Sequence, residues 1–212
     1  MEITTLNNSS QKYFLLALLL FLILPIPITL IPGHGRLFFA ITYTLLVAGG
    51  IQIVKENKRN LIIAIVLGIL SFILVWIDFF NENLDFPHWF KTISLLVFFG
   101  FIAVRLLKVV IFHTSVNLEI IYASISGFLL LGLLGGFFFQ TLELAEPNSF
   151  KLLTNDGSLF DLHYLSFVTL TSLGYGDVTP ITQAGKTMTI VLSVAGQLYL
   201  TILVAILIGK YK

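Results

Sequence analysis

The sequence predicts an all-α membrane protein with six transmembrane helices and a re-entrant segment before the last helix. Of the 212 residues, 57% are hydrophobic and 11% are charged, and the mean hydropathy is +0.98. This balance is too apolar for a soluble domain of the same length. The apolar residues form six long runs, and residues 143–186, between the last two runs, contain a shorter apolar run of their own.

Each long run can form one helix across the membrane. The bilayer core needs about 20 mostly apolar residues per helix. Pro25 and Pro27 are expected to kink the first helix, which is tolerated in a membrane when neighbouring groups satisfy the freed carbonyls. We place the six spans at Tyr13–Ile31, Leu37–Val54, Leu61–Phe80, Thr92–Phe112, Ile120–Leu142 and Thr187–Ile208.

The basic residues predict the orientation of the chain. With the N-terminus in the cytoplasm, the inner side has more basic residues than the outer side, as the positive-inside rule expects. We therefore expect a multi-pass protein of the cell membrane with both termini cytoplasmic. The inner set is Lys12, Lys55, Lys58, Arg59, Arg105, Lys108, Lys210 and Lys212, and the outer set is Arg36, Lys91, Lys151 and Lys186.

The composition argues against several functional classes. There is no cysteine, which excludes disulfides, thiolate metal sites and a catalytic thiol. The net charge of +1 comes without a basic patch, so we expect no nucleic-acid partner. The sequence contains no HExxH motif and no recognisable Ser/His/Asp arrangement, so no motif indicates an enzyme. We therefore expect no catalytic residue and no cofactor.

The segment between the fifth and sixth spans predicts a short re-entrant helix. Residues 155–157, Asn-Asp-Gly, are a turn signal. Ser158 and Asp161 then match a capping box, which opens a helix of about 12 residues that carries the apolar run Leu162–Leu170. A helix of half a membrane span must re-enter, because unpaired backbone in lipid is very costly.

The residues after this helix combine polar side chains with glycine at membrane depth. Backbone that is not helical is tolerated there only where it lines water or ions. Gly174 and Gly176 reach left-handed conformations without steric cost, so successive carbonyls can turn toward one axis. A ring of such carbonyls, with the Ser172 hydroxyl below it, can replace the water shell of a monovalent cation.

This stretch resembles the selectivity filter of potassium channels. The family consensus TVGYG followed by Asp appears here as Ser172-Leu173-Gly174-Tyr175-Gly176-Asp177. The likeness continues into the last span, where Val194-Ala195-Gly196 occupies the family's hinge position, and the whole chain is similar to bacterial six-span potassium channels. The resemblance implies a filter over Thr171–Asp177, formed by four copies in a homotetramer within membrane lipid. Potassium ions are the implied ligand, at Ser172, Leu173, Gly174 and Tyr175.

Four positions depart from the family's common pattern. Ser172 replaces Thr and loses a methyl group that stiffens the rotamer, and Leu173 replaces Val. Val168 stands where some members have a Glu that bonds the aspartate after the filter. Tyr164 stands where many have Trp, and we predict that its hydroxyl reaches Asp177 and braces the filter; packing against the inner helix is the alternative. These departures put inactivation in doubt, and a weakly selective monovalent cation channel is the alternative function.

The last span predicts the cavity and the gate. The resemblance marks Gly196 as a hinge, but this glycine can equally serve close helix packing, as can Gly132 and Gly136 of the fifth span. We expect Gln197 and Ser193 to face an aqueous cavity. Apolar side chains nearer the end of the span can gate by dewetting, and the candidates are Val204, Ala205 and Ile208.

We predict two domains, a four-helix sensor-like domain over residues 1–114 and a pore domain over residues 115–212. A working voltage sensor carries several arginines at every third position of one helix. The fourth span has only Arg105 and Lys108, near its cytoplasmic end, where both can snorkel to the headgroups. We therefore expect weak voltage dependence or none.

A secondary cation transporter is the alternative from another functional class, because transporters also use broken helices near the midplane. Transporters of that kind have internal repeats, and residues 1–106 show none with residues 107–212. The sequence therefore favours a channel with passive conduction and no chemistry.

Overall fold

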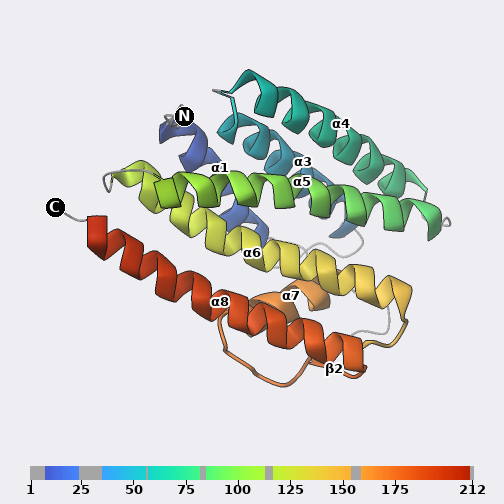
Figure 1. Ribbon diagram of the computed structural model, residues 1–212. Helices are drawn as coiled ribbons and strands as arrows, with labels where there is room; N and C mark the ends of the chain where they lie inside the picture. Colours follow the sequence, from blue (N-terminus) through green and yellow to red (C-terminus); the bar gives the residue numbers. More distant parts are fainter. Residues whose placement is uncertain are drawn as a thin grey trace. The chain divides into compact units, whose positions relative to one another are not determined.

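The computed structural model describes residues 8–23, 35–55, 57–81, 85–112, 117–153 and 159–210. This part of the chain is nearly all helical, with a short two-stranded sheet (Figure 1). It divides into two compact units, residues 1–127 with 210–212, and residues 128–209. The predicted domain boundary between residues 114 and 115 lies outside the described residues.

In the described part of the first unit, four helices follow one another in sequence, and the start of α6 comes after them. Helix α1 packs against α3, α3 against α4, and α4 against α5, and the four run alongside one another in Figure 1. The side chain of Asn57 caps α4 by accepting a hydrogen bond from the backbone N–H of Asn60 at 3.2 Å. The bounds are α1 (Asn8–Ile23), α3 (Gly35–Ile53), α4 (Lys58–Phe80) and α5 (Asp85–Phe112).

A buried group of charges joins α4 to α5 in this unit. The Lys91 ammonium donates to the Asp78 carboxylate at 2.7 Å, and the His88 ring contacts the same carboxylate. Arg36 donates to the backbone carbonyl of Asp78 at 3.3 Å. Lys91, which the sequence analysis placed on the outer side directly before the fourth span, lies inside α5 and is 4% exposed. Pairing with Asp78 explains the difference, because a paired lysine can be buried where a single one cannot.

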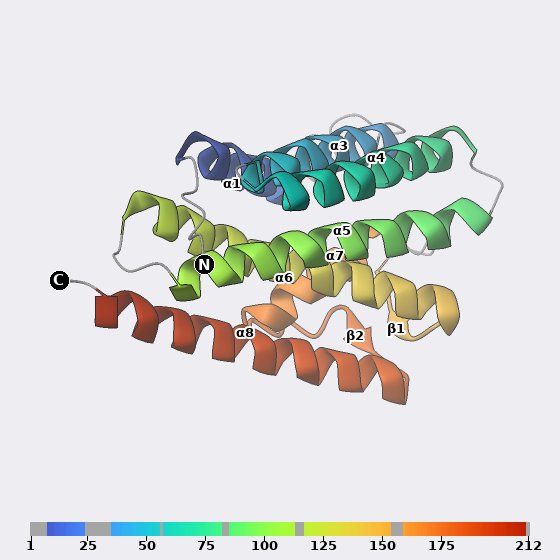
Figure 2. The same cartoon turned by 45° about the horizontal axis from the view of Figure 1, so that its top comes forward.

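The second unit contains the rest of α6 (Leu118–Ala145), followed by β1 (Phe150–Lys151), α7 (Leu159–Leu170), β2 (Thr179–Pro180) and α8 (Gln183–Lys210). Strands β1 and β2 are antiparallel, with Phe150 opposite Pro180. Helix α7 lies between the longer helices α6 and α8 (Figure 2). Its apolar face completes a core with side chains from both of them, formed by Phe139, Phe150, Leu162, Leu165, Leu170, Val178 and Leu192.

Five of the described helices are long and apolar enough to cross a membrane. They correspond to the predicted second to sixth spans. Helix α1 has 16 described residues, and the rest of the predicted first span, with Pro25 and Pro27, lies outside the described part of the chain. The five are Gly35–Ile53, Lys58–Phe80, His88–Phe112, Leu118–Ala145 and Gln183–Gly209.

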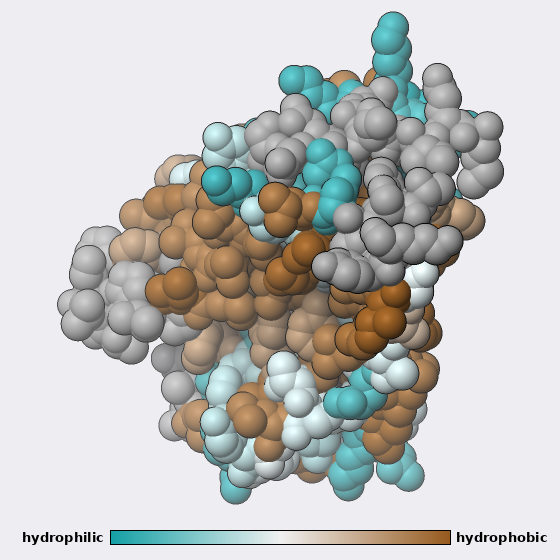
Figure 3. Space-filling model, turned by 90° about the vertical axis from the view of Figure 1, so that its left-hand side faces the viewer, coloured by the Kyte–Doolittle hydropathy of each residue, from teal (hydrophilic) through white to brown (hydrophobic). Residues whose placement is uncertain are grey.

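Large apolar side chains are exposed along the surfaces of these helices. Ile62 and Val66 of α4 and Ile190 and Ile208 of α8 are each more than 60% exposed. Hydrophobic residues cover much of the face shown in Figure 3. Soluble proteins rarely expose so much apolar surface, whereas lipid contact requires it. The helices and their surfaces therefore support a membrane-integral protein.

Candidate functional site

Helix α7 is too short to cross a bilayer. Its 12 residues correspond to about 18 Å, against about 30 Å for the hydrocarbon core. Most of its side chains are buried. The predicted N-cap, Ser158, lies outside the described residues, whereas the Asp161 carboxylate accepts a hydrogen bond from the backbone N–H of Leu153 at 2.9 Å. This bond ties the first turn of α7 to the chain before it.

Glycines of α6 bring α7 close. A methyl group added at Gly136 would overlap the ring of His163, and one added at Gly132 would lie 2.7 Å from Phe167 Cδ1. The Ser166 hydroxyl also donates to the backbone carbonyl of Gly132 at 2.6 Å. Gly132 and Gly136 therefore serve close packing, as the sequence analysis expected of small residues in a membrane helix.

Helix α7 ends in a Schellman motif, whose left-handed residue is Ser172. The backbone N–H of Leu173 donates to the carbonyl of Val168 at 2.9 Å, and the N–H of Ser172 donates to the carbonyl of Thr169 at 3.0 Å. Ser172 has a φ of 59°. Glycine usually occupies this position, because a left-handed backbone is unfavourable for residues with a Cβ atom. The sequence analysis missed this feature, because no glycine marks it.

Left-handed residues continue at every second position of the 171–177 segment. Ser172, Gly174 and Gly176 have φ values of 59°, 63° and 79°, whereas Leu173 and Tyr175 between them have negative φ. A positive φ at every second residue allows successive carbonyl groups to turn toward one side of the chain. The 171–177 segment therefore has the backbone pattern that a row of carbonyl ligands requires.

The residues of this segment are exposed in the single chain. All seven residues from Thr171 to Asp177 are exposed, and Val178, directly after them, is buried. Val168, at the start of the Schellman motif, is 7% exposed. Its backbone carbonyl accepts hydrogen bonds from the N–H of Leu173 at 2.9 Å and from the Thr171 hydroxyl at 3.5 Å.

Tyr164 connects α7 to the last residue of the segment. Its hydroxyl donates to the Asp177 carboxylate at 2.7 Å, as the sequence analysis predicted. Its ring also packs against the apolar core of this unit, and packing against the inner helix itself stays a prediction. Asp177 lies outside the five apolar helices, and the hydrogen bond from Tyr164 lowers the pKa of its carboxyl.

Tyr164→Phe is expected to loosen the Asp177 end of the segment. The variant keeps the packed ring and removes the donor, so amide hydrogen exchange at Val178 should rise by a factor of about 2 to 10. Asp177 ionises more readily in the folded chain than in the unfolded chain. The contribution of the Tyr164–Asp177 bond to stability is therefore complete above the ordinary carboxyl pKa of 3.8, and it is lost as the pH falls through the lower pKa of the folded chain. Tyr122→Phe, in the other unit, is the control, and equal exchange at Val178 in both variants would contradict the prediction.

The chain on either side of α7 is joined by a second set of contacts, which the sequence analysis did not foresee. The backbone carbonyl of Ser149 accepts hydrogen bonds from the N–H groups of Ile181 and Thr182 at 2.8 and 3.3 Å. The Glu143 carboxylate accepts from the N–H groups of Asn148 and Phe150 at 2.8 and 3.1 Å. Together with the β1–β2 pair, these bonds hold the residues after the segment against the end of α6.

Helix α8 approaches the segment at Gly196. A methyl group on Gly196 would overlap the backbone carbonyl oxygen of Leu170, the last residue of α7, and would lie 2.8 Å from Leu170 Cδ1. Helix α8 is continuous through this position. Close packing therefore accounts for the glycine here, and the predicted hinge role stays a prediction. The next residue, Gln197, donates from Nε2 to the Ser172 hydroxyl oxygen at 2.8 Å.

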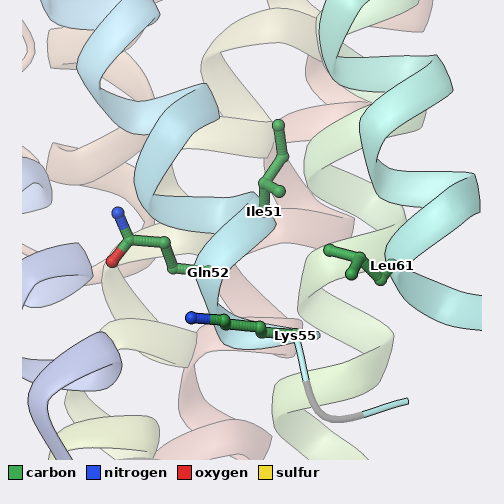
Figure 4. A pocket seen from close by; sticks show the side chains of 4 residues that line it. All are labelled: Ile51, Gln52, Lys55 and Leu61. Carbon is green, nitrogen blue, oxygen red and sulfur yellow. The ribbon is translucent and has the colours of Figure 1, made fainter. Parts of the chain in front are cut away.

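The other residues predicted for the cavity and gate lie on α8. Ser193 is half-buried, and Val204, Ala205 and Ile208 are exposed; their roles stay predictions. A separate pocket at the end of α3 is lined by Ile51, Gln52, Lys55 and Leu61 (Figure 4). It contains none of the residues predicted for the site.

One comparison with known proteins found a match. Residues 127–211 match a family described as "Ion channel". The match covers about two fifths of the chain and includes α7, the 171–177 segment and the whole of α8. Neither the curated proteins nor the solved structures gave a match. The family similarity and the five apolar helices support an ion channel that is integral to a membrane.

Proposed function

We propose that this protein is a potassium-selective channel, in which four copies surround one pore and conduct passively. The observation that carries the proposal is the alternating backbone of the 171–177 segment, with positive φ at Ser172, Gly174 and Gly176. An ion that loses its water shell needs oxygen ligands around it, and a row of carbonyls on one side of a chain supplies them without adding charge.

Four copies are proposed because one segment can cover only one side of an ion. The carbonyls of Ser172, Leu173, Gly174 and Tyr175, with the Ser172 hydroxyl, are the proposed potassium ligands. The exposure of all seven residues from Thr171 to Asp177 in the single chain supports a role for this surface in a larger assembly. No cofactor and no catalytic residue belongs to the proposal.

The first unit is proposed to give the channel weak voltage dependence or none. Arg105 and Lys108 lie near the C-terminal end of α5, where a charge crosses little of the membrane field. We further propose a multi-pass protein of the cell membrane with both termini in the cytoplasm, on the basis of the distribution of lysine and arginine.

A weakly selective monovalent cation channel is the second candidate. The observation that favours it is Ser172, whose side chain lacks the methyl group of threonine and is freer to rotate. The two candidates have the same fold and differ only in the ratio of potassium to sodium permeability.

Gly174→Ala tests the proposed filter. The added methyl meets no atom within 4 Å, so the cost comes from the backbone, whose φ of 63° is unfavourable for alanine by about 1–2 kcal/mol in each subunit. We expect vesicles that contain the variant to lose the potassium efflux of the wild-type protein.

Gly100→Ala is the matched control. Its methyl also meets no atom within 4 Å, and Gly100 lies in α5 without a positive φ. We expect wild-type efflux from Gly100→Ala vesicles. Wild-type potassium efflux from assembled Gly174→Ala would overturn the assignment of the filter.

A further inference from the structure

The side chain of Gln197 lies beside the first left-handed residue of the filter. Its amide Nε2 donates to the Ser172 hydroxyl oxygen at 2.8 Å, and the two residues are 25 positions apart in the chain. The contact depends on Gly196, because the lack of a side chain there lets α8 reach the end of α7. Both residues are exposed in the single chain, so neither is held by burial.

A serine at position 172 has a conformational cost. This position ends α7 with a φ of 59°, where glycine is preferred and a β-branched residue is most unfavourable. Serine keeps a hydroxyl group at this position without a second substituent on Cβ. The serine side chain rotates more freely about χ1 than a threonine side chain, because serine lacks the second Cβ substituent that restricts this angle.

The Gln197 amide restores that restriction. The NH₂ group of Gln197 can only donate, so the Ser172 oxygen accepts its hydrogen bond with one lone pair. The second lone pair of that oxygen stays available to a cation. An amide also does this without charge, whereas a charged group beside the filter would hold a permeant ion too tightly for it to leave.

We propose that Gln197 is a positioning residue that fixes the Ser172 hydroxyl and thereby helps to determine which monovalent cation passes. This inference rests on the proposed function, because it assigns Ser172 to an ion site. It places a determinant of selectivity on α8, outside the segment that lines the ion path.

Gln197→Met tests the inference, because methionine has a similar length and no donor. The potassium-to-sodium permeability ratio, measured from reversal potentials, is expected to fall by a factor of about 2 to 10, the effect of one hydrogen bond. Gln197→Asn keeps the amide on a side chain one methylene shorter, and the same fall is expected. Thr187→Val, near the start of α8, removes a hydroxyl that donates to the backbone carbonyl of Gln183 in the same helix, and its ratio should match the wild type.

A double-mutant cycle tests whether Gln197 acts through Ser172. In a Ser172→Ala background the acceptor is absent, so Gln197→Met should cause no further fall in the ratio. A selective wild type with unchanged ratios in Gln197→Met and Gln197→Asn would overturn the inference and leave the proposed function standing. A wild type without potassium selectivity would overturn the proposed function itself. If neither variant assembles, the amide serves assembly rather than ion selection, and the inference is wrong.

Discussion

Lys91→Met is expected to lower the free energy of unfolding by about 3–5 kcal/mol, the usual effect of removing one partner from a buried ion pair. Asp78 and Lys91 are 7% and 4% exposed and are joined by a hydrogen bond of 2.7 Å. Without the ammonium group, the Asp78 carboxylate keeps its contact with the His88 ring but loses the permanent positive charge beside it, at a residue that is only 7% exposed. Loss of helical circular dichroism, as SDS is added to the protein in detergent, measures the change.

Lys108→Met is the control on the same helix. Lys108 is exposed, so its replacement is expected to change stability by less than about 0.5 kcal/mol. Asp78→Asn combined with Lys91→Met should recover part of the loss, because no uncompensated carboxylate remains. Equal stabilities for Lys91→Met and Lys108→Met would show that the pair contributes nothing.

Gly196→Ala is expected to abolish potassium conduction by displacing the start of the filter. The methyl group would overlap the backbone carbonyl of Leu170, which cannot rotate away as a flexible side chain can. Either α7 or α8 must shift, at a cost of about 1–3 kcal/mol in each subunit. The filter starts at the next residue, Thr171, and should move with Leu170. Potassium efflux from vesicles and the oligomeric state in detergent measure the effect.

Gly209→Ala separates this overlap from a general loss of glycine in α8. A methyl group at Gly209 meets no atom within 4 Å, so conduction and assembly should be unchanged. Normal efflux from Gly196→Ala would show that α8 does not approach α7 as closely as Leu170 and Gly196 indicate.

The local features of the site were predictable because they depend on neighbouring residues. Continuous apolar runs predicted the helices α3 to α6 and α8, and the 12 residues of α7 agree with the length expected from the capping box. The hydrogen bond between Tyr164 and Asp177 was predictable from the motif, because both positions have known counterparts in the family that the chain resembles.

Contacts between distant residues could not be predicted in this way. The bond from Gln197 to Ser172 and the pair of Lys91 with Asp78 join different helices, and hydrophobic periodicity says nothing about which polar groups meet. The left-handed conformation of Ser172 was missed for another reason. In a sequence, a helix end of this type is identified by the glycine that usually occupies its left-handed position. A serine at that position does not indicate a helix end in this way.

The most direct test of the central claim is a reversal potential. The purified wild-type protein is placed in a planar bilayer with potassium chloride on one side and sodium chloride on the other. Selective conduction predicts current that reverses near the potassium equilibrium potential and is lost in Gly174→Ala. Reversal near zero, with sodium and potassium equally permeant, would contradict a potassium-selective filter at residues 171–177.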